Sequence, residues 1–245
     1  MWTGSGMAAA LVVGLAVGLW MRYDRAAPFG PEALVTGANE VATVTLQDET
    51  VVRLAPGSRL TFFRDDDVRE VSLTGRAYFA VAKDPSRPFR VRLPGGDVEV
   101  LGTRFDVESR DADVQVAVVE GEVRVEAHGA RLQLEANQVA RVPGTGSPEV
   151  RRVEDPFEVI TWLGVFLAFE STPIEQVAEE FGRRFDLQVE ITDEALRGRT
   201  VTGWFADQTP AEMIAGICTV LEAECVLEEE IVRMRIAPPG PGRSG

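Results

Sequence analysis

The stretch RPFRVRLPGGDVEVLGTRFDV, from Arg87 to Val107, alternates apolar and polar residues on both sides of a turn that contains Pro94, Gly95 and Gly96. Alternation with a period of two is typical of half-buried β-strands, and a glycine turn between two such runs is typical of a hairpin. The stretch holds no evident reactive group. It therefore predicts a packed β framework that carries no chemistry of its own.

The same period continues on both sides of this stretch, from Val41 to Val142. The segments GDVEV (96–100) and GEVRV (121–125) repeat one turn-and-strand formula. Many short strands at regular spacing predict an all-β domain, an antiparallel sandwich or a short solenoid, and not the βαβ core of many enzymes. We assign residues 26–154 to this domain, in a chain long enough for one large domain or two small ones.

The period changes after Trp162, which predicts a small α+β domain over residues 155–236. The motif TPIE (172–175) predicts a helix with Thr172 as N-cap, Pro173 at its first position and Glu175 closing a capping box. The motif TPAE (209–212) repeats this signal, and each helix follows a strand that ends in phenylalanine. The domain is therefore predicted to be an internal duplication, with a boundary from the β-rich domain in the Pro/Gly/Ser stretch 143–148.

The last predicted strand, Ile231 to Ile236, is a candidate partner-binding edge. Arg233 and Arg235 alternate with apolar residues, so one face of the strand is expected to be exposed to solvent. The strand is followed only by the tail, which is not expected to cover it. An open edge can take a partner strand by β-augmentation, for which Ile231, Arg233 and Arg235 are the candidate residues. The alternative is an internal strand that closes the core.

Residues 1–25 are predicted to form a transmembrane anchor, because the run from Met7 to Met21 is apolar without interruption. A helix from Trp2 to Trp20 would rise about 27 Å, close to the ~30 Å thickness of the hydrocarbon layer. A cleaved signal peptide is the alternative, although a basic start and a small-residue cleavage site are both lacking. The tail 237–245 is rich in proline and glycine and is expected to be disordered.

Composition excludes several classes of function. The formal net charge is −14, so a basic surface for nucleic acid is not expected. Neither a catalytic constellation nor a metal or cofactor motif emerges, and the acidic residues Asp106, Glu108, Asp111 and Asp113 are expected to line an exposed strand face.

Cys218 and Cys225 are either a free, buried pair or a local disulfide formed in an oxidising compartment.

Several segments together resemble the FecR family of membrane-bound anti-sigma regulators. The most specific are GRAYF (75–79) and LGTRF (101–105), followed by VAVVEGEVRV (116–125). The segment from Trp162 to Ile191 and the one from Val201 to Ile217 resemble the short domain that ends many such regulators, which is similar to the secretin/TonB short N-terminal fold. Arg76 departs from the family pattern, in which an acidic residue is usual.

The resemblance implies a function without catalysis. A regulator of this type is anchored by one helix in the inner membrane, with most of the chain in the periplasm. It relays a signal from a TonB-dependent outer-membrane transporter, often one for iron siderophores, to an extracytoplasmic-function sigma factor. The segment that would bind the sigma factor is not seen here, and Arg22 and Arg25 after the apolar run would by charge alone favour the opposite orientation. A periplasmic structural or transport adaptor and an envelope hydrolase are the alternatives.

Overall fold

The computed structural model describes residues 31–62, 69–228 and 230–236. The predicted anchor, residues 1–25, and the predicted tail, residues 237–245, lie outside the described residues. Within the described part of the chain, no helix combines the length and the apolar character that crossing a membrane requires.

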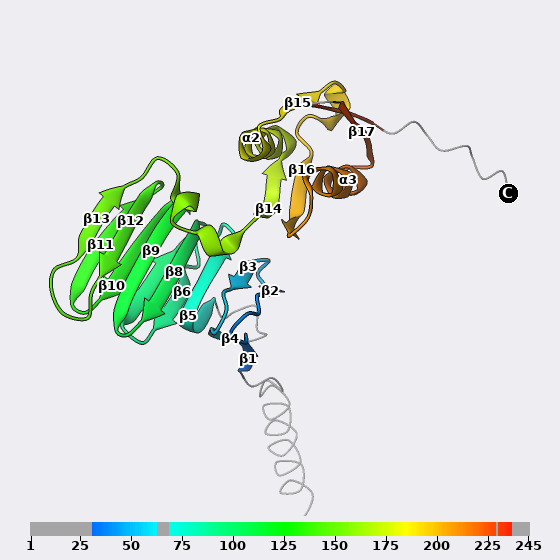
Figure 1. The fold of residues 1–245 in the computed structure, drawn as a ribbon. Helices are drawn as coiled ribbons and strands as arrows, with labels where there is room; N and C mark the ends of the chain where they lie inside the picture. The colour runs from blue at the N-terminus through cyan, green and yellow to red at the C-terminus, as the bar shows by residue number, and fades with distance from the viewer. Residues whose placement is uncertain (1–30, 63–68, 229, 237–245) are drawn as a thin grey trace, which may run out of the picture.

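Thirteen strands of the described chain form one strongly curled sheet, whose two halves share the bent strand β5 (Glu70–Ala80) (Figure 1). The first half runs in the order β11 (Ala130–Glu135), β10 (Glu122–Ala127), β7 (Gly96–Val100), β6 (Phe89–Leu93), β5, β4 (Arg59–Phe62), β1 (Glu32–Val35). The second half runs in the order β13 (Glu149–Arg152), β12 (Gln138–Val142), β9 (Asp113–Glu120), β8 (Arg104–Arg110), β5, β3 (Val51–Leu54), β2 (Ala42–Thr45).

Gly75 lies where β5 passes from one half of the sheet to the other. Thr74 still pairs with Arg59 of β4, whereas Gly75 pairs with Ser109 of β8. Its φ of 95° is open to glycine and strained for other residues, and an added Cβ would lie 2.9 Å from the Cα of Ser58. Glycine is therefore required at this position by both conformation and space.

The core of this unit lies between the two halves of the sheet and is built from the alternate residues of almost every strand. In the hairpin β6–β7, Phe89 faces Val100 and Val91 faces Val98, and all four side chains are buried. Phe79 of β5 stacks on Phe105 of β8 at 5.2 Å between ring centroids. The predicted β-rich character is confirmed. The expected antiparallel sandwich or short solenoid is corrected, because the strands form one curled sheet, a half-barrel, in which β5 and β6 pair in parallel.

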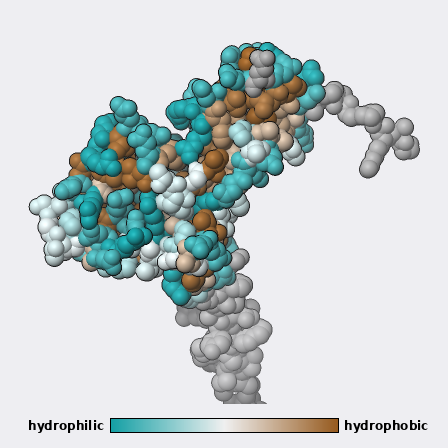
Figure 2. Space-filling view, viewed as in Figure 1, coloured by the Kyte–Doolittle hydropathy of each residue, from teal (hydrophilic) through white to brown (hydrophobic). Residues whose placement is uncertain are grey.

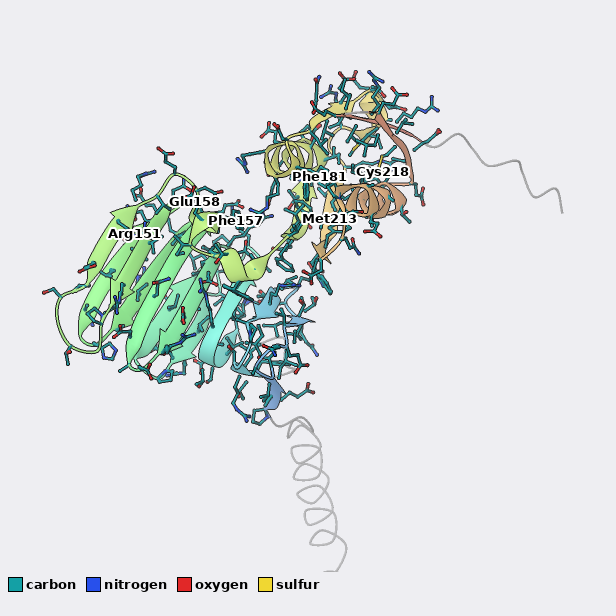
Figure 3. The ribbon with its side chains drawn as sticks, viewed as in Figure 1. Arg151, Phe157, Glu158, Phe181, Met213 and Cys218 are labelled. Carbon is teal, nitrogen blue, oxygen red and sulfur yellow. A yellow bond between two sulfur atoms is a disulfide. The ribbon has the colours of Figure 1, made fainter. Side chains whose placement is uncertain are left out.

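The C-terminal unit is a duplicated strand–helix–strand. The first copy is β14 (Phe166–Pro173), α2 (Ile174–Phe185) and β15 (Gln188–Ile191); the second is β16 (Thr200–Ala206), α3 (Pro210–Val220) and β17 (Ala223–Glu228), followed by β18 (Ile231–Ile236). β14 pairs with β16, and β18 lies between β15 and β17. The helices pack between these two small sheets, with Phe181 of α2 and Met213 of α3 both in the core (Figure 3).

The two TPxE motifs behave differently. At α3 the predicted capping box is confirmed: the Thr209 hydroxyl accepts from the Glu212 N–H, and the Glu212 carboxylate accepts from the Thr209 N–H. At α2 the prediction is wrong, because Thr172 belongs to β14 and the helix has no side-chain cap. The Thr172 hydroxyl instead accepts a hydrogen bond from the N–H of Glu170, at an irregularity of the strand.

The stretch 143–148 is a turn inside the β-rich unit. It joins β12 to β13, which pair antiparallel from Gln138↔Arg152 to Arg141↔Glu149, and the Gly144 N–H donates to Asp113. The expectation that this stretch separates two domains is therefore wrong. The chain leaves the sheet only after Arg152.

Candidate functional site

Cys218 and Cys225 are joined by a disulfide with 6.2 Å between their Cα atoms. The bond links the last turn of α3 to the third residue of β17, and Cys218 is buried in the core of the C-terminal unit. The chain holds no free cysteine. The disulfide fixes the edge strand β17 to the helix beside it.

The candidate edge strand is in fact an internal strand. Residues Gln188–Ile191 pair with β18 in parallel on one side, and Ala223–Glu228 pair with it antiparallel on the other. Arg233 forms ion pairs with Glu190 and Glu228 on these neighbours, and Arg235 forms one with Glu224. The expectation that Ile231, Arg233 and Arg235 form an open edge is therefore wrong.

The edges of this sheet among the described residues are β15 and β17, and each borders a groove beside a helix. The groove between α3 and β17 has a volume of about 330 Å³, and the disulfide forms part of its floor. The groove between α2 and β15 has a volume of about 430 Å³. Val226 and Leu227 of β17 are 39% and 40% exposed, and Figure 2 shows apolar residues gathered on the visible face of this unit.

A second apolar cluster joins the two units. The outer face of the second half of the sheet carries Tyr78, Ala117 and Val139, which are all buried. They are covered by the connection after β13 and by the start of β14, through Ile160, Leu163, Phe166 and Ala168. The rings of Tyr78 and Phe166 meet edge to face at 5.7 Å. We call this contact between the two units the joint.

Three arginines of the β-rich unit surround the joint, and each lies over an aromatic ring from the C-terminal side. The guanidinium groups of Arg53, Arg76 and Arg104 lie 5.1, 5.7 and 5.8 Å from the ring centres of Phe166, Trp162 and Phe169, respectively. A cation over an aromatic face is attracted by the ring quadrupole, more strongly where water is excluded.

Two of these arginines also form ion pairs across the joint. Arg104 lies 2.7 Å from Glu180 of α2, and both side chains are mostly buried. Arg53 lies 2.7 Å from Asp207, the residue after β16, which is exposed. The pair with Glu180 should contribute more than the pair with Asp207, since solvent screens an exposed charge.

The third arginine, Arg76, holds a buried carboxylate under the connection. Arg76 lies 2.8 Å from Asp106 and 3.3 Å from Glu108, and it donates to the carbonyl of Val159. The second oxygen of Asp106 accepts a hydrogen bond of 2.8 Å from the indole N–H of Trp162. Asp106 thus joins two strands of the sheet to the connection between the units.

Burial raises the pKa of Asp106 to about 6, even though Arg76 and Trp162 both stabilise the charged form. The residue is 1% exposed, so the expectation of an exposed acidic strand face is wrong at this position. The signal in the sequence was Trp162, where the period changes, because an indole N–H that is shielded from water needs an acceptor; Trp162 is half-buried in the structure. The sequence alone did not identify Asp106 as that acceptor.

A cleft of about 780 Å³ opens beside Arg104, between the sheet and α2. Arg184 of α2 lies 4.1 Å above the ring of Phe157, which extends into this region from the connection (Figure 3). Among the described residues, no group of three or more His, Cys, Asp or Glu side chains could hold a metal ion. The arrangement of the joint suits mechanical coupling between two units.

Both units match models of one protein family. The FecR protein model matches residues 32–124, and the FecR C-terminal model matches residues 166–233. The chain belongs to the FecR family. It is thereby placed among regulatory proteins, as the resemblance of GRAYF and LGTRF predicted. No curated protein matches the chain.

Two crystal structures from Parabacteroides distasonis, at 1.65 and 2.50 Å resolution, are similar to this FecR-family chain. Both are described as a candidate anti-sigma factor and share 26% sequence identity with it. The similarity covers 84% and 85% of this chain and 100% of those chains, with TM-scores of 0.51 and 0.52. It therefore extends over both units and the joint.

Proposed function

We propose that this FecR-family chain is an anti-sigma regulator that is anchored in the inner membrane and has its two described units in the periplasm. Its C-terminal unit receives a signal from a TonB-dependent outer-membrane transporter. The signal passes through the joint and the β-rich unit towards the membrane, and it ends at an extracytoplasmic-function sigma factor. The chain performs no catalysis in this scheme, and the associated transport is that of iron complexes.

The observation that carries the proposal is the match of both units to the family, at residues 32–124 and 166–233. The similarity to a candidate anti-sigma factor over the same length supports it. The disulfide Cys218–Cys225 agrees with an oxidising compartment.

We place the receiving surface at β17. An exposed sheet edge can accept an extended segment of a partner, whose backbone gives affinity and whose side chains enter the neighbouring groove. β17 offers such an edge, two exposed apolar side chains and the groove along α3. The disulfide keeps this edge ordered before a partner arrives, which lowers the entropic cost of binding.

The receiving surface is tested by capture of the transporter's periplasmic signalling domain with the full-length chain. Leu227→Lys places a charge in the groove and should lower capture about tenfold or more. Gln188→Lys adds the same charge to the opposite edge strand β15, where Gln188 is exposed, and should leave capture unchanged. Equal loss in both variants, or in neither, would place the receiving surface elsewhere.

The anchoring is tested by fusing alkaline phosphatase after Gly245. The proposal expects an active fusion, because the enzyme folds only where its disulfides form. An inactive phosphatase together with an active cytoplasmic reporter at the same position would reverse the topology. Inhibition of a co-expressed extracytoplasmic-function sigma factor by the full-length protein, read from a sigma-dependent reporter, tests the regulatory part separately.

A further inference from the structure

The strand β13 (Glu149–Arg152) is the last strand of the curled sheet on the side away from β2. Among the described strands it pairs only with β12, and all four of its residues are exposed. Figure 3 shows Arg151 on this outer strand, on the opposite side of the sheet from the C-terminal unit. None of the three roles proposed above, namely reception, relay and anchoring, uses this edge.

The backbone of β13 presents free hydrogen-bonding groups along its outer side. The N–H of Val153 donates to the carbonyl of Asn137 on the β12 side. Because neighbouring residues of an antiparallel strand point their N–H and C=O groups to opposite sides, Glu149 and Arg151 bond inward. Val150 and Arg152 therefore direct their N–H and C=O groups outward.

Charged side chains commonly protect such an edge from other strands. Here the charges are self-complementary. Glu149 lies opposite Arg141, and Arg151 lies opposite Val139, so both side chains project from the outer face of the sheet. Val150 lies opposite the core residue Ala140, on the inner face, and is 48% exposed. Glu149 and Arg151 form no ion pair with any other described residue. Arg141, opposite Glu149 on β12, attracts the Glu149 charge but forms its ion pair with Asp113, so both exposed side chains can still meet a partner.

We propose that β13 pairs antiparallel with β13 of a second copy of this chain, about a two-fold axis through Val150. In this register the inner faces of the two sheets lie on one side of the pair and the outer faces lie on the other. Val150 then faces Val150 of the partner, and Glu149 faces Arg151 of the partner, twice. Opposite charges directly across two strands are favourable, whereas like charges there are unfavourable.

The two-fold register also fits the backbone. The outward groups of Val150 exchange two hydrogen bonds with those of the partner's Val150. The outward N–H of Arg152 meets the carbonyl of the partner's Pro148, which needs only to accept because proline has no N–H. Beyond this residue the ladder cannot continue, so the contact is short. A short contact gives a weak dimer.

The experiment replaces Val150 by cysteine in the purified full-length chain and adds a mild oxidant. Residues that face each other in a hydrogen-bonded antiparallel pair have Cα atoms about 5.5 Å apart, which suits a disulfide. Since Cys218 and Cys225 are already paired, the new thiol is the only one available. Val150→Cys should give a covalent dimer on a non-reducing gel. Val220→Cys, which is also exposed and lies on α3, should stay monomeric.

Charge reversal in the Val150→Cys background tests the register. Glu149→Arg or Arg151→Glu alone places like charges across the pair twice and should lower the rate of cross-linking about tenfold. The double variant Glu149→Arg/Arg151→Glu restores opposite charges and should restore the rate. Equal cross-linking of Val150→Cys and Val220→Cys would overturn the proposal, as would failure of the double variant to recover while its circular dichroism spectrum matches that of the parent.

Discussion

Asp106 shows how one residue connects the two units of the protein. Its carboxylate accepts from Arg76 on the neighbouring strand and from Trp162 on the connection, at 2.8 Å in both cases. A buried charge is costly unless it is paired and hydrogen-bonded, so the three side chains depend on one another. Removing Arg76 leaves the buried Asp106 carboxylate with the indole N–H alone, and removing Asp106 takes away the acceptor of that N–H.

The first prediction concerns the effect of pH on this carboxyl group. Its pKa is raised from 3.8 to about 6 in the folded protein, so the folded state binds the proton more tightly than the unfolded chain does. The free energy of unfolding therefore falls as the pH rises from about 4 to about 6, and the loss is complete above that window. The shift corresponds to about 3 kcal/mol.

Asp106→Asn removes this titration. The free energy of unfolding of the variant relative to the wild type should rise by about 3 kcal/mol between pH 4 and pH 7 and stay constant above pH 7. Denaturant unfolding at several pH values measures it. Glu126→Gln, at the exposed pair with Arg131, is the control for pH effects unrelated to burial. If the difference in free energy of unfolding between Asp106→Asn and the wild type does not change with pH, the pKa of Asp106 is not raised.

At the scale of the element, the two TPxE motifs show how far a local pattern can be trusted. Thr209 caps α3 as the pattern predicts, whereas Thr172 is part of β14, and Pro173 lies before the first residue of α2. The pairing of Thr172 with Val201 and of Pro173 with Thr200 extends the strand up to the helix. Tertiary pairing with β16 has overridden the cap at α2, which the sequence alone could not reveal.

The second prediction follows from the cap that did form. Thr209→Ala removes the oxygen that accepts from Glu212 and should lower the free energy of unfolding by about 1 kcal/mol. Thr209→Ser keeps the hydroxyl group and should lower it by much less. Thermal unfolding of both variants decides the matter, and an equal loss would show that the methyl group, and not the cap, stabilises α3.

The third prediction concerns the disulfide that fixes β17 to α3. Its cysteines are seven residues apart, and by the chain-entropy estimate such a loop contributes about 2–3 kcal/mol. Addition of a reductant should lower the free energy of unfolding by that amount, and the Cys218→Ala/Cys225→Ala variant should be insensitive to it. Alkylation of both thiols in protein purified without reductant would contradict the bond.

Local sequence patterns predicted the individual strands and helices well, but they predicted less well which elements pair with or contact one another. The alternation in Arg87–Val107 and the capping signal at Thr209 are local properties, and both predictions are confirmed. Whether Ile231–Ile236 lies at an edge depends on the parallel pairing of Gln188 with Ile231, some forty residues apart in sequence. The burial of Asp106 likewise depends on Trp162, which follows it in the sequence only after five further strands, β9 to β13. Period and composition contain no information about such distant pairs.

At the scale of the whole molecule, the joint decides whether the two units move together. An apolar cluster around Tyr78 and Phe166 supplies its centre, and three arginines that lie over aromatic rings surround that centre. Interfaces between domains that are small and polar usually allow relative motion, whereas apolar burial restricts it. In the proposed relay, a signal that reaches the C-terminal unit passes to the β-rich unit only if this contact is stiff.

The fourth prediction is that the arginines of the joint make the two units unfold as one. The variant Arg53→Ala/Arg76→Ala/Arg104→Ala removes the cations that pair with Asp106 and Glu180. It also removes the cation–π contacts to three aromatic rings. Together these losses should weaken the joint by several kcal/mol. Calorimetry should then show two transitions in place of the single transition of the wild type. Limited proteolysis should cut first between residues 153 and 165.

The control for this variant removes three arginines of the same unit whose ion pairs are exposed and lie away from the joint. Arg90, Arg92 and Arg124 bond to Glu99 and Glu70 on the strands of the first half of the sheet. Replacing all three by alanine changes the net charge by the same amount as the first triple variant. Because exposed ion pairs contribute little, this control should still unfold in one transition and should keep residues 153–165 resistant to protease. If both triple variants show two transitions, the net charge and not the joint couples the units. If neither does, the apolar cluster alone is sufficient, and the arginines serve another purpose.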